Sequence, residues 1–441
     1  MMTATQSAEN ISTGLLKVME RAKDPLLVFT SLAHLLDEDA LTRALHRIRK
    51  DAAVGVDGVT KEQYETKLES NIHGLHQRLR KMEWRHQPIR RVHIPKEKGK
   101  TRPIGISALE DKIVQGALCE ILEAIYEPLF HDNSYGFRKG RGTHDALRAL
   151  NEVLYGGKAS WILELDVQSY FDSIDRKLLN EVLRERVTDG SLLRLIGKCL
   201  HVGVLDGAEY SEPEEGTAQG SVLSPMLGNI YLHHVLDVWF EREVTPRLRG
   251  RSHLIRYADD AVITFEHEDD ARRVLGVITK RFERYGLKLH PEKTRVVKFT
   301  RPDKRDPTAK GPGTFDFLGF THLWARSRSG AFMPRVRTRT TKLRRFLLTV
   351  ADWCRSHRHE PLKEQHVALT RRIAGHFNYF GANGNVESLR HVAKACEAIW
   401  YKWLNRRSQR SRLNWKRFAE LLRTFPLPAP RITFQLWKAA P

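Results

Sequence analysis

The apolar residues of this chain recur with two different periods, which predicts a protein that mixes helices and strands. Helical spacing covers the ranges 26–50, 60–82, 108–128, 142–155 and 338–424. Short runs of β-branched and aromatic residues predict strands at 89–95, 102–106 and 162–167, and a hairpin over 315–337. The pattern therefore predicts the α+β class, with about four helices in the last helical range.

Segments that follow neither period separate these elements. Residues 1–20 are polar and are expected to be loosely ordered. The basic run 96–100 reads as a tip between the first two strands, and the Pro-, Gly- and Lys-rich stretch 301–313 is the clearest loop. Regular structure is expected to end at the Pro-rich segment 426–430.

Two adjacent carboxylates stand at the turn of a predicted strand–turn–strand segment, 253–265. The turn reads Tyr257-Ala258-Asp259-Asp260, and most residues around it are β-branched or aromatic. Unpaired carboxylates among apolar neighbours are costly unless a cation neutralises them, so the turn is typical of a divalent-metal site. A second pair, Asp269-Asp270, lies among charged residues and is expected to form the solvated first turn of a helix.

A third acid in a similar setting, Asp166, lies near the end of the predicted strand 162–167. If two strands bring it to Asp259 and Asp260, the three can hold two metal ions about 3.5–4 Å apart, an arrangement that supports phosphoryl transfer. Hard oxygen ligands and substrate phosphates favour Mg²⁺. The alternative is that Asp166 caps the helix predicted at 176–184, although Asp172 or Asp175 is better placed for that role.

Charge is distributed unevenly along the chain, whose formal net charge is +21. Residues 301–441 hold 29 Lys and Arg against 9 Asp and Glu, whereas the first 300 residues hold 45 and 44. A generic solubility charge would be spread evenly. The basic C-terminal third therefore predicts a nucleic-acid surface whose affinity falls as salt rises.

The cysteines and the hydropathy pattern exclude several other classes of protein. Neither zinc binding nor a disulfide is indicated, because the four cysteines lack short spacings and stand in apolar contexts: Cys119, Cys199, Cys354 and Cys396. No apolar run approaches the length of a membrane span, and no secretory segment is visible. The chain is expected to be cytoplasmic, with association to the nucleoid compatible and no membrane partner.

Eight segments in chain order, from about residue 54 onward, resemble the motifs of group II intron-type reverse transcriptases. They are 55–60, 92–106, 133–147, the strand that carries Asp166, 216–231, 256–260, 286–294 and 315–320. A further segment, 375–381, resembles the thumb or maturase motif of intron-encoded proteins. A series of this length in the correct order is not expected by chance.

The resemblance implies a right-hand polymerase: fingers, a palm with an antiparallel sheet, and a C-terminal α-helical thumb or maturase domain. The implied domains are the N-terminal extension and fingers at 1–158, the palm at 159–337, with which the fingers interleave, and the thumb at 338–441.

The implied activity is RNA-directed DNA polymerisation, in which two Mg²⁺ ions help to add dNTPs to a DNA primer on an RNA template. Asp166, Asp259 and Asp260 would be the catalytic residues, and Val167 would join them as a metal ligand.

Four residues are expected to contact the incoming nucleotide: Lys96, Arg102, Phe171 and Gln219. The two cations flank the basic tip and would neutralise triphosphate charge. Phe171 lies where the resemblance places a side chain under the sugar, and a bulky ring there would exclude a 2′-hydroxyl and select deoxyribonucleotides. Tyr170 is adjacent and only one of the two can point to the site, so the alternative is that Phe171 belongs to the core.

Nucleic-acid contacts are predicted at Arg138, Arg141, Gly220, Lys293, Arg371, Arg372, Arg406 and Arg407. Arg138 and Arg141 are expected at the template backbone, with a plain surface turn as the alternative. Gly220 would let the backbone approach a base pair, and Lys293 is either a phosphate or primer contact or a surface lysine. The thumb arginines alternate with aromatic residues, as in many RNA-binding surfaces, although many of those rings are expected in the helical core.

Three functions stay open at this point. The first is an intron-encoded reverse transcriptase and maturase that binds intron RNA to assist splicing and mobility. The second is a domesticated relative serving phage defence, CRISPR spacer acquisition or DNA repair. The third is an RNA-binding splicing factor alone, which the intact set of three aspartates disfavours. No Cys-x-x-Cys pair and no His-Asn-His-like segment follow residue 425, so no DNA endonuclease domain is expected.

Overall fold

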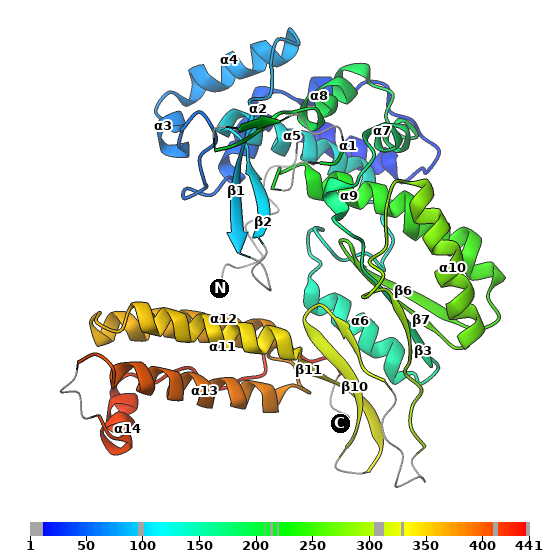
Figure 1. Ribbon diagram of the computed structural model, residues 1–441. Helices are drawn as coiled ribbons and strands as arrows, with labels where there is room; N and C mark the ends of the chain where they lie inside the picture. Colours follow the sequence, from blue (N-terminus) through cyan, green and yellow to red (C-terminus); the bar gives the residue numbers. More distant parts are fainter. Residues whose placement is uncertain are drawn as a thin grey trace.

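The computed structural model describes residues 12–95, 101–207, 209–211, 215–217, 220–303, 313–327, 330–408 and 413–437. Its elements form three groups (Figure 1). One group carries the strands β1 and β2 at its lower edge, the second surrounds the sheet of β3, β6 and β7, and the third contains the sheet of β9, β10 and β11 and the helices α11–α14. The predicted α+β class is confirmed.

The N-terminal helices begin where a side chain can satisfy their free N–H groups. α1 (Thr13–Ala22) follows Ser12, whose hydroxyl accepts from the N–H of Leu15, and α2 (Glu38–Arg47) follows Asp37 in the same way. The expectation that residues 1–20 are loosely ordered is therefore wrong from residue 13 onward. The helix is stable there because Leu15, Val18 and Ala22 are buried.

The other N-terminal helices are shorter than predicted. In the range 26–50, residues 26–32 are not helical, because Phe29 pairs with Val187 and the N–H of Leu32 donates to the Asp189 carboxylate. The range 60–82 contains two helices, α3 (Lys61–Glu65) and α4 (Leu68–Arg80), separated where Lys67 leaves the helical conformation.

A central helix and a small sheet complete this first group. α5 (Leu109–Tyr126) is largely buried and contacts α1, α2 and α8 (Gly190–Leu200). The sheet has the order β2-β1-β4-β5. Its strands are β1 (Ile89–Pro95), β2 (Thr101–Ile106), β4 (Val204–Asp206) and β5 (Glu209–Ser211).

The second group is an antiparallel sheet of order β6-β7-β3-β8. Its strands are β6 (Ser252–Tyr257), β7 (Asp260–Phe265), β3 (Trp161–Leu165) and β8 (Arg295–Lys298). Successive side chains point to opposite faces. Leu163 packs in the cluster that contains α10 (Glu268–Arg284), whereas Ile162 packs in the cluster that contains α6 (Thr143–Tyr155). Both faces are therefore covered.

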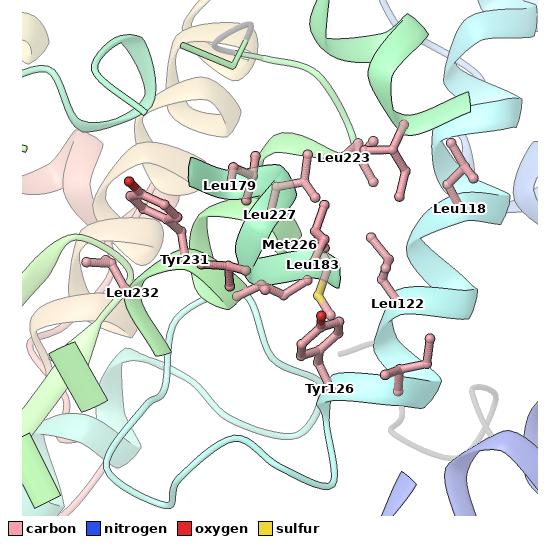
Figure 2. Close-up of a cluster of buried hydrophobic side chains, with 14 of the residues drawn as sticks. Leu118, Leu122, Tyr126, Leu179, Leu183, Leu223, Met226, Leu227, Tyr231 and Leu232 are labelled. Atoms are coloured by element: carbon pink, nitrogen blue, oxygen red, sulfur yellow. The ribbon is translucent and has the colours of Figure 1, made fainter. Parts of the chain in front are cut away.

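Two further helices connect the first two groups. α7 (Arg176–Arg184) contacts α9 (Ser224–Leu232), which also contacts α5. Figure 2 shows the apolar contact in which Leu118 and Leu122 of α5 face Leu223 and Met226. These residues belong to one hydrophobic cluster that extends from α1 to α10.

The third group begins with β9 (Phe315–Phe317), β10 (Phe320–Arg326) and β11 (Phe332–Thr338), so the predicted hairpin has one additional strand. Four helices follow, as the helical spacing of 338–424 predicted: α11 (Thr340–Ser356), α12 (Leu362–Phe380), α13 (Val386–Leu404) and α14 (Trp415–Thr424). No helix in the described part of the chain is long and apolar enough to cross a bilayer.

The segment 431–437 returns from this helical group to the central sheet. Phe434 pairs with Ala382 and stacks on His144 of α6, with 3.7 Å between the ring centroids. The amide of Asn151, also in α6, donates to the carbonyl of Leu436. The helical group is therefore attached to the sheet both through β11 and through this returning segment.

Candidate functional site

The three predicted acids line one cavity of about 810 Å³ at the centre of the molecule. Asp166 follows β3, Asp259 stands in the turn between β6 and β7, and Asp260 is the first residue of β7. Arg102 of β2 and Phe171 line the same cavity, as does Lys342 of α11. All three groups of elements therefore contribute to its walls.

The turn between β6 and β7 is tight and closely packed. Tyr257 pairs with Asp260 across it, and Ala258 has a φ of +56°, the left-handed region that a two-residue hairpin turn requires. Gly136 packs directly against this turn, because a Cβ added there would lie 2.3 Å from the backbone nitrogen of Ala258. The segment around Gly136 thus restrains the acidic turn from the side.

The register of the sheet places the acids side by side. Leu165 pairs with Ala261, so one further step along the antiparallel pair sets Asp166 opposite Asp260. The carbonyl of Asp166 accepts from the N–H of His290, which fixes the end of β3 on its other side. Val167 and Leu289 form a non-hydrogen-bonded antiparallel pair, so the N–H and C=O of Val167 point away from Leu289. Its role as a metal ligand stays a prediction.

A buried arginine that the sequence did not single out supports the acidic turn. Arg256 is fully buried and donates to both carboxylate oxygens of Asp237, at 2.9 and 2.6 Å. It also donates to the side chain of Asn229 and to the carbonyl of Ala258, both at 3.0 Å. Despite the cost of burial, the guanidinium holds the pKa of Asp237 well below its usual range. An arginine inside an apolar strand, directly before the acidic turn, is the signal that could have revealed this support.

The pKa values of Asp259 and Asp260 are raised by burial and by the neighbouring carboxylates. Burial raises the pKa of Asp259, and the Asp166 carboxylate adds to the effect. Enclosure in the cavity, followed by the charges of Asp259 and Asp166, raises the pKa of Asp260 to about 6. The Asp260 side chain is reached by solvent, which screens part of this repulsion. Such mutually destabilised carboxylates are what a bound cation would relieve.

Asp166 differs from the other two acids because it has a cationic partner. Lys293 donates to both of its oxygens, at 3.0 and 2.8 Å. In the described part of the chain, no three His, Cys, Asp or Glu side chains are gathered closely enough to form a ready metal site. The donor set is nevertheless all carboxylate oxygen, as Mg²⁺ prefers. The residues therefore fit a divalent ion, provided that Lys293 gives up Asp166.

The two adjacent aromatic residues after β3 have different environments. Tyr170 is buried, and its hydroxyl donates to the carbonyl of Gly228 at 2.6 Å. Phe171 is partly buried and lines the cavity with the three aspartates. Of the two, it is therefore Phe171 that faces the site. The helix that follows is capped by Asp175, which accepts from Lys177 and Leu178, so the expected cap lies there rather than at Asp166.

The remaining nucleotide contacts are only partly visible. Arg102 is exposed on the cavity wall, and its charge acts to lower the pKa of Asp259. Lys96 and Gln219 lie outside the described residues. Gly220 has a φ of +106°, and a Cβ added there would lie 2.4 Å from the carbonyl oxygen of Gly105. The close approach seen at this glycine is thus to β2, and its contact with a base pair stays a prediction.

Arg138 does not face a template, and that prediction is wrong. Its side chain is 3% exposed and donates to both oxygens of Glu127. It also donates to the carbonyls of His131 and Ser134, so its polar groups are used within the fold. Arg141 is partly exposed and pairs with Asp132, so a contact with nucleic acid there stays a prediction.

The four thumb arginines also differ in availability. Arg371 and Arg406 are exposed, and Arg406 lies 5.5 Å from the ring centroid of Trp403. Arg372 stacks over Trp353 at 4.5 Å, and Arg407 donates to the carbonyls of His359 and Glu360. Arg407 therefore has a structural role in joining α13 to the turn before α12. RNA binding by these four residues stays a prediction.

Comparison with known proteins agrees with this site. A family model described as reverse transcriptase (RNA-dependent DNA polymerase) matches residues 94–322, more than half of the chain. The protein YkfC of Escherichia coli K12 is 31% identical over 349 residues, which are 70% of this chain and 87% of YkfC.

Intron-encoded proteins are also similar. The group II intron-encoded protein LtrA of Lactococcus lactis is 33% identical over 286 residues, which are 62% of this chain but only 47% of LtrA. Nuclear intron maturase 4 of Arabidopsis thaliana is 34% identical over 123 residues, 27% of this chain and 15% of that protein. The resemblance to group II intron-type enzymes is thus confirmed, and the chain belongs to the reverse transcriptase family of RNA-directed DNA polymerases.

Proposed function

We propose that this chain adds dNTPs to a DNA primer on an RNA template and that Asp166, Asp259 and Asp260 hold two Mg²⁺ ions. The observation that carries the proposal is the meeting of these three carboxylates in one open cavity, where the pKa values of Asp259 and Asp260 are raised. Two bound ions would supply charge stabilisation for the attacking and leaving oxygens of phosphoryl transfer.

Lys293 would act as a counter-charge that changes partner. In this structure it neutralises Asp166 through two hydrogen bonds. Its side chain is half-exposed, so it can leave the carboxylate without exposing an apolar surface. Once released, the ammonium group would be available for the phosphates of the nucleotide or of the primer strand.

Phe171 would select the sugar of the incoming nucleotide. It projects into the cavity beside the acids, whereas Tyr170 is fixed in the core by its bond to Gly228. A rigid ring at this place leaves no room for a 2′-hydroxyl. The product would therefore be DNA, and shortening the side chain would admit ribonucleotides.

The basic helices α11–α14 would hold the template–primer duplex and structured RNA. Exposed arginines such as Arg371 and Arg406 lie on these helices. LtrA is described as a group II intron-encoded protein, and we propose by analogy that this chain also binds intron RNA to assist splicing and mobility. Arg371→Ala with Arg406→Ala should weaken RNA binding and flatten its salt dependence while leaving metal binding unchanged.

The decisive experiment is primer extension by the purified protein on an RNA template, with Mg²⁺ and either dNTPs or rNTPs. We expect extension with dNTPs alone, and incorporation of rNTPs once Phe171 is replaced by Ala. Absence of any extension by the native protein would favour an RNA-binding role. Extension without stimulation of intron splicing would favour a host role such as phage defence, spacer acquisition or DNA repair.

A further inference from the structure

Two residues of α5, Gln115 and Cys119, hydrogen-bond to the backbone of Val222 in the segment before α9. The side-chain oxygen of Gln115 accepts from the N–H of Val222 at 3.0 Å. The thiol of Cys119, one turn further along α5, lies 3.4 Å from the carbonyl oxygen of Val222 as its donor. Both polar groups of the Val222 backbone are thus bound to one face of a buried helix.

The same face of α5 carries the apolar contact with α9. Leu118 and Leu122 lie between and beyond the two polar residues in helical spacing, and they face Leu223 and Met226 (Figure 2). The apolar residues therefore dock α9 itself, whereas Gln115 and Cys119 fix the turn that leads into it. Apolar and polar residues that alternate on this face thus have different roles.

Gln115 is itself oriented by a buried hydrogen-bond chain. Nδ1 of His86 lies 2.6 Å from the carbonyl of Gln87, so this nitrogen carries the proton and Nε2 is left as an acceptor. The amide nitrogen of Gln115 lies 2.8 Å from that Nε2. Burial lowers the pKa of His86 to about 4, which keeps the ring neutral. The amide oxygen of Gln115 must therefore face Val222.

Described residues that precede this anchor contact the wall of the candidate active site and β2. Thr217 donates from its backbone N–H to the carbonyl of Phe171 at 2.6 Å. Gly220 is pressed against Gly105 of β2, as described above. On either side of residues 218–219, the described residues thus contact Phe171 at Thr217, β2 at Gly220 and α5 at Val222.

We infer that Gln115 is a positioning residue for nucleotide binding: through Val222 it sets the place of the residues that lead into α9 and that press, at Gly220, against β2, the strand whose Arg102 lines the candidate site. The inference rests on the proposed polymerase function. Gln115 is fully buried and outside the cavity lining, so it acts through the segment and touches no substrate. Cys119 supports the same anchor from the carbonyl side.

The test compares Gln115→Leu with the native enzyme in steady-state primer extension and in hydrogen–deuterium exchange. We expect the KM for dNTP to rise roughly two- to tenfold, the value of one lost hydrogen bond, with kcat changed less than about twofold. The affinity for template–primer should be unchanged. The peptide that contains 220–223 should exchange faster, which is a readout independent of activity.

Two further variants separate positioning from folding. Ser107→Ala removes a hydroxyl that lies 3.4 Å from the amide nitrogen of Gln115, and it leaves the hydrogen bond to Val222 in place. This variant should behave as native. Cys119→Ala should raise the KM for dNTP in the same direction, and Cys119→Ser, which keeps a donor, should restore it. If Gln115→Leu does not fold, the comparison of Cys119→Ala with Cys119→Ser provides the test.

The outcomes distinguish the inference from the function on which it rests. An active native enzyme, with native KM and native exchange in folded Gln115→Leu, overturns the positioning role. A lower melting temperature and a lower active fraction at unchanged KM would show a structural role only. A native protein that extends no primer refutes the proposed function, while faster exchange in Gln115→Leu would still show the anchor.

Discussion

Two Asp-Asp pairs, separated by only ten positions, have opposite roles in this molecule. Asp270 lies in the first turn of α10, is 1% exposed, and accepts from the N–H groups of Arg249 and Gly250 at 3.0 and 3.1 Å. Asp259 and Asp260 stand in a hairpin turn at the cavity, and among the described residues no basic side chain pairs with either. Asp270 of the first pair is satisfied by protein groups, whereas the hairpin pair is available to a ligand.

The comparison teaches that the dipeptide itself carries little information. At 269–270 the expectation of a solvated helix start is correct for Asp269, which is 81% exposed, and wrong for Asp270, which the preceding loop covers. At 259–260 the hairpin places both carboxylates where enclosure in the cavity, and then the neighbouring carboxylates, raise their pKa values. What surrounds each pair decides whether it stabilises the fold or serves chemistry.

The largest expected effect is the loss of polymerisation in Asp259→Ala. Removing one carboxylate of the proposed metal site should lower the rate of primer extension by about a thousandfold or more, because several kcal/mol of charge stabilisation disappear. Asp269→Ala is the matched control and should extend primers at the native rate. Equal activity in the two variants would show that the hairpin pair has no catalytic role.

The second effect is a pH dependence confined to the hairpin pair. The pKa of Asp260 is raised to about 6, so ionisation of this carboxyl destabilises the fold without metal as pH rises through that value. As pH falls below about 6, protonation of the same carboxyl competes with metal binding. Affinity for Mn²⁺, measured by calorimetry, should therefore decrease up to about tenfold per pH unit below about 6. Affinity that is constant down to pH about 5 would contradict the shared carboxylate site.

A smaller effect is expected at Lys293, which neutralises the third acid. Lys293→Met should raise the Mn²⁺ affinity of the free protein roughly fivefold, because the variant removes one positive charge near the ligands. The effect is small because solvent screens this half-exposed charge. The KM for dNTP should rise at the same time if the ammonium group moves to phosphate. Lower metal affinity in this variant would mean that Lys293 helps to hold Asp166 in place.

The smallest expected effect concerns stability alone. Asp270→Ala should lower the free energy of unfolding by about 1–3 kcal/mol, because two backbone N–H groups lose their buried acceptor. Primer extension per folded molecule should not change. Chemical denaturation gives the first quantity and active-site titration the second, and a loss of specific activity would remove the distinction between the two pairs.

Local features of the site could be predicted from the sequence, whereas its distant supports could not. The hairpin 253–265, the strand before Asp166 and the cap at Asp175 follow from short-range patterns of residue type. Arg256, in contrast, contacts Asn229 on α9 and Asp237 on the helical segment that follows α9, and no local pattern encodes those contacts. The burial of Arg138 escaped prediction for the same reason, since its partner Glu127 lies at the end of α5.

The returning segment 431–437 changes how the four C-terminal helices can move. They are joined to the sheet by covalent chain at β11 and by the contacts of Phe434 and Leu436 with α6. A body fastened at two points has one easy motion, rotation about the line that joins them. Opening and closing over a nucleic-acid duplex would then be a rotation about that line rather than a free swing about a single attachment point.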